Sequence, residues 1–149
     1  SWQRPNHFKL CAPDRMTAQA HHTQGGTPVS NLNTIELKAF IPAKNFELSK
    51  QFYIDFGFVK ASDEEDVAYF HAGNCSFLLQ NFYTPALAEN LMMHLLVEDI
   101  HGWYQQVIDA ELSSKYGVKV TAIVEQPWRM LDFVVTDPSG ILWRIGQNI

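Results

Sequence analysis

The chain repeats one order of expected elements twice, and this repetition limits the possible fold more than any other feature. Residues 34–83 contain patterns for a strand, a helix and three further strands, and residues 90–149 contain the same series. The closing hairpins correspond in letters, because "AYFHAGNCSFLLQ" in the first half matches "DFVVTDPSGILWRIGQ" in the second. Matching order across both halves indicates a duplicated βαβββ module.

The first strand of module one is expected at residues 34–41. Ile35, Leu37 and Ala39 alternate with polar neighbours, which predicts a strand with one apolar face. Pro42 should end that strand because proline cannot donate to a ladder. Phe40 lies on the polar side of the pattern and is a candidate for lining a cavity.

Helix and turn boundaries are marked by their usual residues. Asn45 and Asp99 can cap the two helices, expected to end at Gly57 and Gly117 respectively. The second helix is therefore expected as one piece over residues 99–117, followed by a strand at 118–126. "DPSG", residues 137–140, has proline at the second turn position and glycine at the fourth, which suits a type I turn.

Composition places the chain among ordinary globular domains. Its 149 residues are 46% hydrophobic and 18% charged, which favours one packed domain at 34–149 after a polar N-terminal arm at 1–33. The net charge of −5 without a basic stripe argues against nucleic-acid binding. No apolar run is long enough for a membrane span. Cys11 and Cys75, the only cysteines, suggest reduced thiols and a cytoplasmic location.

Several stretches of the duplicated modules are similar to those of a known protein family. "SKQFYIDFGF", "LLVEDIHGWY" and "EQPWRMLDFVVTDPSGILWRIGQ" resemble the vicinal oxygen chelate superfamily, which includes glyoxalases, extradiol dioxygenases and bleomycin resistance proteins. The last stretch is most similar to the bleomycin-resistance branch. The resemblance implies an α+β fold in which two tandem βαβββ modules form a curved mixed-sheet cup with helices outside. It also implies a homodimer, often with modules exchanged between chains.

The resemblance implies a divalent metal in the enzymatic members, but this chain departs from their ligand positions. Counting along the shared motifs, these positions fall on Lys38, Met92, Arg144 and the region of residues 78–80. Ammonium and guanidinium groups repel a metal cation, and only Gln80 in the last region could coordinate one. We therefore expect no metal and no other cofactor.

Seven residues are the candidates for ligand binding: Lys38, Phe40, Met92, His94, Trp128, Asp132 and Arg144. Trp128 stands before a strand, where it could form a stacking wall, an interface or part of the core. Lys38 and Arg144 could bind an anion or carbonyl, or form salt bridges to Glu36 or Asp132. His94 could face the cup or be a hydrogen-bonded histidine without a ligand.

The sequence thus predicts a metal-free protein that sequesters a small organic ligand in an aromatic pocket, as in antibiotic resistance, with no catalytic residue. One alternative is a lyase or dioxygenase with a displaced metal site that uses His94 and Gln80. Another is an interaction module whose cup is filled by side chains and whose dimer surface is the function. The pair His21-His22 is expected in a solvated loop.

Overall fold

The computed structural model describes residues 30–149, and the chain from Ile35 onward forms one compact unit. The first module comprises β1 (Phe40–Pro42), α1 (Phe46–Phe56), β2 (Val59–Asp63), β3 (Val67–Ala72) and β4 (Cys75–Gln80). A short helix, α2 (Pro85–Ala88), leads to the second module. This module comprises β5 (Met92–Leu96), α3 (Ile100–Asp109), α4 (Leu112–Tyr116), β6 (Val124–Gln126), β7 (Met130–Thr136) and β8 (Leu142–Asn148). The predicted α+β class with tandem βαβββ modules is confirmed.

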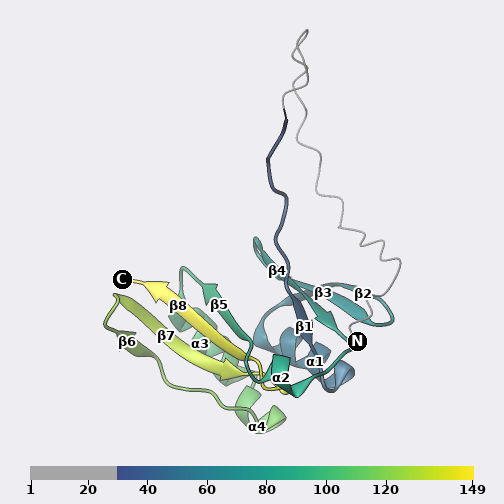
Figure 1. Cartoon of the computed structure of the whole chain (residues 1–149). Helices are drawn as coiled ribbons and strands as arrows, with labels where there is room; N and C mark the ends of the chain where they lie inside the picture. Colours follow the sequence, from purple (N-terminus) through teal and green to yellow (C-terminus); the bar gives the residue numbers. More distant parts are fainter. Residues whose placement is uncertain (1–29) are drawn as a thin grey trace. The chain divides into compact units, whose positions relative to one another are not determined.

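The two modules build two mixed sheets of the same topology. Sheet A has the order β1-β4-β3-β2 and sheet B the order β5-β8-β7-β6. In each sheet the first strand of the module pairs in parallel with the last, while the other neighbours are antiparallel. In Figure 1 β5, β8 and β7 lie side by side, with α3 behind them.

Each sheet buries one face against helices, and no helix of the described residues covers its other face, which we call the helix-free face. Phe77 of sheet A and Trp143 of sheet B lie on the buried faces, and both rings contact Tyr53 of α1. The Trp143 indole donates a hydrogen bond to the Tyr53 hydroxyl (3.0 Å), which donates to the Asp137 carboxylate (2.5 Å). Burial raises the pKa of Asp137. One aromatic core therefore holds both modules together.

The predicted helix caps and turn are confirmed. The Asn45 side chain accepts a hydrogen bond from the Leu48 amide (3.1 Å), and Asp99 accepts one from the Gly102 amide (3.0 Å). Gly57 ends α1 with a φ of 122°, which a side chain would disfavour. The 137–140 turn closes through an amide–carbonyl hydrogen bond of 3.1 Å.

The predicted strand at 34–41 is wrong over most of its length. Strand β1 begins only at Phe40, and the side chains of Ile35 and Leu37 are 100% and 93% exposed. Before β1, the backbone hydrogen bond to the partner strand β4 is the one from the Leu78 amide to the Ala39 carbonyl. Continuing the parallel register back from Phe40 and Leu78 sets Leu37 opposite Cys75, the first residue of β4, so β4 has no partner residue for positions 34–36.

The predicted helix at 99–117 is also wrong, because it is two helices. The chain breaks at Ala110 and Glu111, and Glu111 takes a left-handed φ of 53°. The break lets Tyr116 of α4 turn back toward α1, where its hydroxyl donates to Asp55 (2.5 Å). The strand predicted at 118–126 is likewise shorter, since β6 begins at Val124 after an isolated bridge at Val120.

Some predictions fall on residues that the structure does not describe. The polar arm expected at 1–33 lies almost wholly there, as do Cys11 and the pair His21-His22. Among the described residues, no helix combines the length and the apolar character needed to cross a membrane.

Candidate functional site

Five of the seven predicted ligand-binding residues belong to sheet B. Met92 and His94 come from β5, Arg144 from β8, Asp132 from β7, and Trp128 from the turn between β6 and β7. His94 lies directly opposite Arg144 in the parallel pair. The alternation of side chains along each strand puts the four strand residues on the helix-free face.

Asp132 anchors the polar part of this face. Its carboxylate accepts a hydrogen bond from Nη1 of Arg144 (2.6 Å) and another from Nε2 of Gln126 (2.9 Å). The Asp132 side chain is 3% exposed and that of Arg144 is 29% exposed. The salt bridge considered for Arg144 is therefore present. A guanidinium carries five N–H donors, so Arg144 keeps donors for a ligand while Asp132 fixes its direction.

Gly146 provides space between the polar side chains of this face. A Cβ atom at this position would lie 2.7 Å from Sδ of Met130 and 2.9 Å from Nε2 of His94. The side chains of His94 and Met130 therefore extend over Gly146, and Asp132 is the residue opposite Gly146 in the β7–β8 register. Gly146 lets an imidazole, a thioether and an ion pair gather within a small area.

Trp128 stands at the edge of sheet B. Its side chain is 59% exposed, and the backbone turns directly after it, where Arg129 takes a left-handed φ of 63°. The possibility that Trp128 is a core residue is thus excluded. Trp143, by contrast, is 3% exposed and belongs to the core.

Lys38 and Phe40 lie with sheet A. The Lys38 ammonium is 2.9 Å from a carboxylate oxygen of Glu36 and 4.8 Å from the ring centre of Tyr69. The other Glu36 oxygen accepts hydrogen bonds from the hydroxyls of Tyr69 (2.6 Å) and Ser76. These bonds, that of Ser76 first, lower the pKa of Glu36 to about 2. The salt bridge considered for Lys38 is therefore present too.

The structure thus divides the seven predicted residues into two groups on two sheets. Sequence reasoning missed Gln126 and Met130 on sheet B, and Tyr69 and Ser76 on sheet A. The motif "EQPW" contains Gln126 beside Trp128, so its position was visible in the sequence. Its role as a second donor to Asp132 depends on the register of β6 against β7, which the sequence does not state.

The residues at the family's metal positions do not fit a divalent ion. None of these positions holds an imidazole, and His94, two residues after Met92, lies opposite Arg144 in the parallel pair. Gln80, its proposed co-ligand, belongs to sheet A. Within residues 30–149, no group of three or more His, Cys, Asp or Glu side chains could hold a metal ion. We therefore derive no chemistry through a metal.

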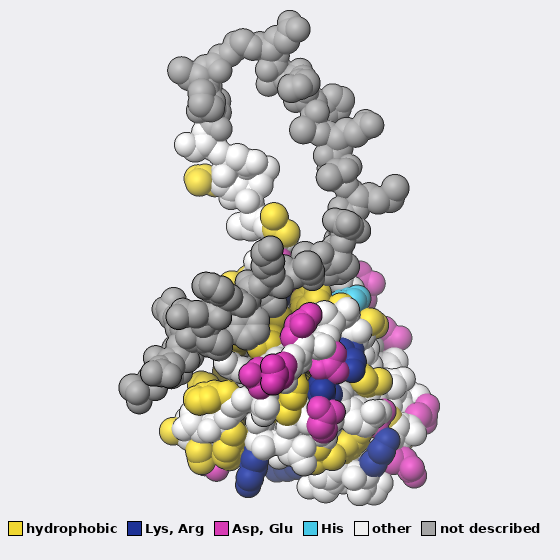
Figure 2. Space-filling view, turned by 90° about the vertical axis from the view of Figure 1, so that its right-hand side faces the viewer, with side chains coloured by type: hydrophobic (Ala, Val, Ile, Leu, Met, Phe, Trp, Pro, Cys, Tyr) yellow, Lys and Arg dark blue, Asp and Glu magenta, His cyan; other side chains and the backbone are white. Residues whose placement is uncertain are grey.

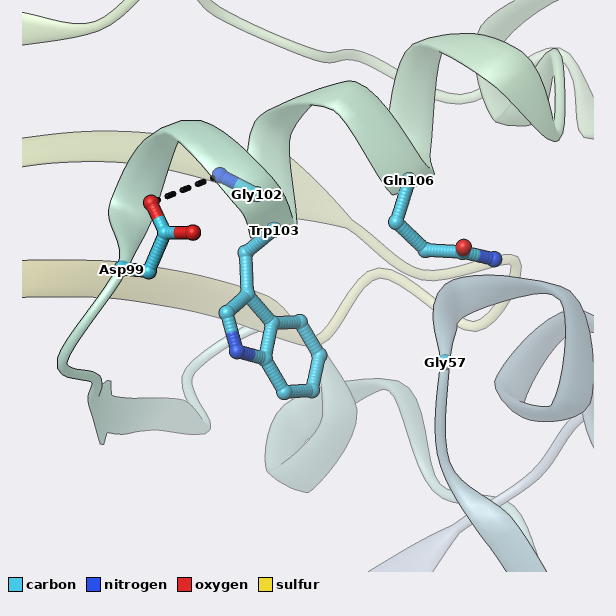
Figure 3. A pocket seen from close by; sticks show the side chains of 5 residues that line it. All are labelled: Gly57, Asp99, Gly102, Trp103 and Gln106. Carbon is cyan, nitrogen blue, oxygen red and sulfur yellow. Dashed lines mark hydrogen bonds between the residues drawn. The ribbon is translucent and has the colours of Figure 1, made fainter.

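A cavity of about 320 Å³ lies on the helical side of the unit. It is lined by Gly57 after α1 and by Asp99, Gly102, Trp103 and Gln106 at the start of α3. Figure 3 shows the Trp103 indole and the Gln106 amide extending from α3 toward Gly57, with Asp99 bonded to the first turn. No residue of the predicted site lines this cavity.

The sequence predicted a surface without a basic stripe, and the face in Figure 2 is consistent with this. On the face seen in Figure 2, acidic and basic side chains of the described residues are interspersed, and no basic patch gathers there. This face gives no support to nucleic-acid binding.

Two βαβββ modules, each forming a mixed sheet of the same strand order, define the class of fold. The profile of the Glyoxalase/Bleomycin resistance protein/Dioxygenase superfamily matches residues 31–145, and the chain belongs to this family. No curated protein sequence matches the chain significantly.

Solved structures show the same fold at low sequence identity. A bleomycin-binding protein complexed with bleomycin aligns with a TM-score of 0.65 and 23% identity, covering 78% of this chain and 100% of that one. A bleomycin resistance determinant encoded on the transposon Tn5 gives 0.62 and 20%, covering 77% and 98%. Lactoylglutathione lyase from Agrobacterium tumefaciens gives 0.58 and 14%, covering 78% and 96%.

Proposed function

We propose that this protein binds and sequesters a small organic ligand on the helix-free face of sheet B, without a metal and without changing the ligand. The observation that carries the proposal is the Arg144–Asp132–Gln126 arrangement, with the exposed Trp128 in the turn that follows Gln126. It combines a fixed hydrogen-bond donor with an aromatic surface, the usual contents of a small-molecule site.

The relatives support binding more than catalysis. Two of the similar structures are named for bleomycin resistance or bleomycin binding, and one of them contains bleomycin. The superfamily also includes enzymes, among them the lyase reported above. Membership alone therefore does not choose between the two. The choice rests on the cation at Arg144, which stands where the enzymatic members are expected to have a metal-binding glutamate.

The proposed roles differ between the residues. Arg144 and His94 would orient polar groups of the ligand, Asp132 would hold Arg144 in place, and Met92 and Trp128 would supply apolar contact. The proposal includes a homodimer, a cytoplasmic location and a role in antibiotic resistance. The net charge of −5 favours a cationic ligand over an anionic one, whereas the Arg144 guanidinium at the site favours a carbonyl or anionic group, so the proposal assigns the ligand no charge.

Calorimetric titration with bleomycin and with other cationic aromatic drugs tests the proposal. We expect saturable binding by at least one compound, unchanged by a chelator. Trp128→Leu should weaken that binding by roughly tenfold, which corresponds to one lost aromatic contact. Trp103→Phe, on the helical side, is the matched control and should leave the affinity unchanged. If no compound binds, the proposal of sequestration fails. If both variants weaken binding equally, the site is wrongly placed.

Metal analysis of the purified protein tests the metal-free part. Substoichiometric Ni²⁺, Zn²⁺ and Fe²⁺ with full binding activity is the expected result. A stoichiometric transition metal whose removal abolishes binding would instead support the enzyme reading.

A further inference from the structure

We propose that the ligand on sheet B presents a neutral carbonyl oxygen to Arg144, as an amide or an aromatic ketone does, and that its flat apolar part lies over Met92, Val134 and Leu142. The inference rests on the proposed function, because it assigns the ligand of that same site to a chemical class. This class is that of aromatic compounds with an uncharged hydrogen-bond acceptor.

Arg144 has more hydrogen-bond donors than its own chain uses. The guanidinium has five N–H groups, and within residues 30–149 the Asp132 carboxylate is the one group that accepts a hydrogen bond from it, through Nη1 (2.6 Å). The Arg144 side chain is 29% exposed, and β8 lies between β5 and β7, so a ligand on the helix-free face would lie over it. The remaining donors are therefore available to an acceptor of the ligand.

The ion pair with Asp132 determines which charge that acceptor should have. The Asp132 carboxylate, whose side chain is 3% exposed, already balances the charge of the guanidinium. A ligand carboxylate bound to Arg144 would lose its water shell and lie close to Asp132, which would repel it. A ligand cation would be repelled by the guanidinium. A neutral carbonyl meets neither repulsion, and it still accepts a charge-assisted hydrogen bond, which is stronger than one between neutral groups.

One side of Arg144 along β8 is already filled by the chain itself. Gly146, two residues further on, is buried, and a Cβ atom there would lie 2.7 Å from Sδ of Met130 and 2.9 Å from Nε2 of His94. A ligand group beside Gly146 would have to displace the thioether or the imidazole. We therefore place the apolar part of the ligand on the opposite side of Arg144.

That opposite side is apolar and accessible. Leu142, two residues before Arg144, pairs with Met92 of β5, and Val134 of β7 pairs with Arg144 itself. The two-residue spacing puts Leu142 and Arg144 on the same face of the sheet. Met92 is 57% exposed, and Leu142 and Val134 are partly exposed. A flat ring over these side chains would remove apolar surface from water, which favours binding.

A matched series of three probes tests the class of the ligand. Benzamide, benzoate and benzylammonium share one phenyl ring and differ in the charge of the substituent. Each is titrated into the ¹⁵N-labelled full chain, and the affinity is taken from the shifts of amides in β5, β7 and β8. We expect benzamide to bind more tightly than either charged probe by roughly tenfold, the effect of one hydrogen bond to a charged group. Equal or tighter binding of a charged probe, or unchanged amides with all three, would overturn the inference.

Asp132→Asn tests the physical reason for this preference. The substitution keeps the size of the side chain and an acceptor for Arg144, but it removes the balancing charge. Benzoate should then bind more tightly than benzamide, a change in relative affinity of roughly tenfold or more. Glu36→Gln makes the same change in the ion pair of sheet A and is the matched control, which should keep the preference of the wild type. A preference for benzamide that persists in Asp132→Asn would contradict the role of the ion pair.

The probe series and the drug titration can fail separately. The titrations of the wild type are decisive by themselves if Asp132→Asn does not fold. A drug that binds on sheet B, while benzoate or benzylammonium binds there more tightly than benzamide, would overturn the chemical class and leave sequestration standing. If benzamide binds there as expected and no drug binds, the class is supported and the proposal of sequestration fails.

Discussion

The helix-free faces of the two sheets have the same strand order but differ in what covers them. On sheet A the chain's own Glu36 and Lys38 lie over Tyr69, and the apolar side chains below, Val67 and Leu78, are buried. On sheet B no described segment plays this part, and Met92 and Trp128 are exposed. The duplicated fold therefore provides two comparable faces, and the one on sheet B has the accessible surface that a ligand needs.

The ion pairs of the two faces also differ in exposure, and the carboxylate on sheet B is the more buried one. Lys38 and Glu36 are neighbours in sequence, equally exposed, and join a segment to its own sheet. Arg144 and Asp132 come from two strands, and the carboxylate is nearly buried. A buried carboxylate needs its partners, whereas a more exposed pair can exchange its contacts with water. Arg144 is thus held more firmly than Lys38, as a preorganised binding group should be.

The largest effect is expected in the core that the two modules share. Trp143→Ala should lower the free energy of unfolding by about 3–5 kcal/mol, because it removes a buried ring that contacts Tyr53 and Phe77. Urea denaturation measures this. Trp128→Ala is the matched control, and it should change the free energy by less than ~0.5 kcal/mol. Equal losses in both variants would mean that Trp128 is also buried.

A smaller effect should separate the two ion pairs. Arg144→Ala leaves the nearly buried Asp132 with Gln126 alone and should lower the free energy of unfolding by about 2 kcal/mol. Lys38→Ala breaks the more accessible pair and should cost about 0–1 kcal/mol. The comparison uses the same denaturation assay, and a reversed order would contradict the contrast between the faces.

The smallest expected effect is the pH dependence of the contacts that Glu36 makes with Tyr69 and Ser76. The folded pKa of Glu36 is about 2, below its usual 4.5, so its stabilising contribution is present above pH 4.5. That contribution is lost as the pH falls from about 4.5 toward 2. Glu36→Gln cannot titrate, so the wild type should lose more unfolding free energy than this variant over that range. Parallel curves for the two proteins would show that Glu36 is not held by Ser76 and Tyr69.

The sequence predicted the fold better than the site because the two depend on different interactions. Helix caps at Asn45 and Asp99 and the turn at 137–140 are local, and each formed as expected. The alternation at 34–41 predicted a strand with a buried apolar side, but Ile35 and Leu37 are 100% and 93% exposed, so no core among the described residues covers that side. The break at Glu111 carries no local signal and follows from the contact between α4 and α1.

For the site, the sequence identified residue types and strands but not their grouping. The registers of β5, β7 and β8 place Met92, His94, Asp132 and Arg144 on one face of sheet B, a grouping that the sequence alone left open. The assignment of Lys38 to the same site as Arg144 required the first strand of module one to lie near the last strand of module two. That proximity depends on how the two sheets are placed, which strand patterns do not determine. The partners of Asp132 required the register of a short strand, β6, which single-sequence patterns do not fix.

Amide chemical-shift mapping in solution tests the central claim most directly. A drug that binds by calorimetry is added to ¹⁵N-labelled protein in the presence of a chelator. We predict that the perturbed amides cluster in β5, β7 and β8 and around Trp128, with the Trp128 indole among the most affected. Perturbations centred on Gly57, Asp99 and Trp103 would place the ligand in the cavity on the helical side and contradict the assignment to sheet B.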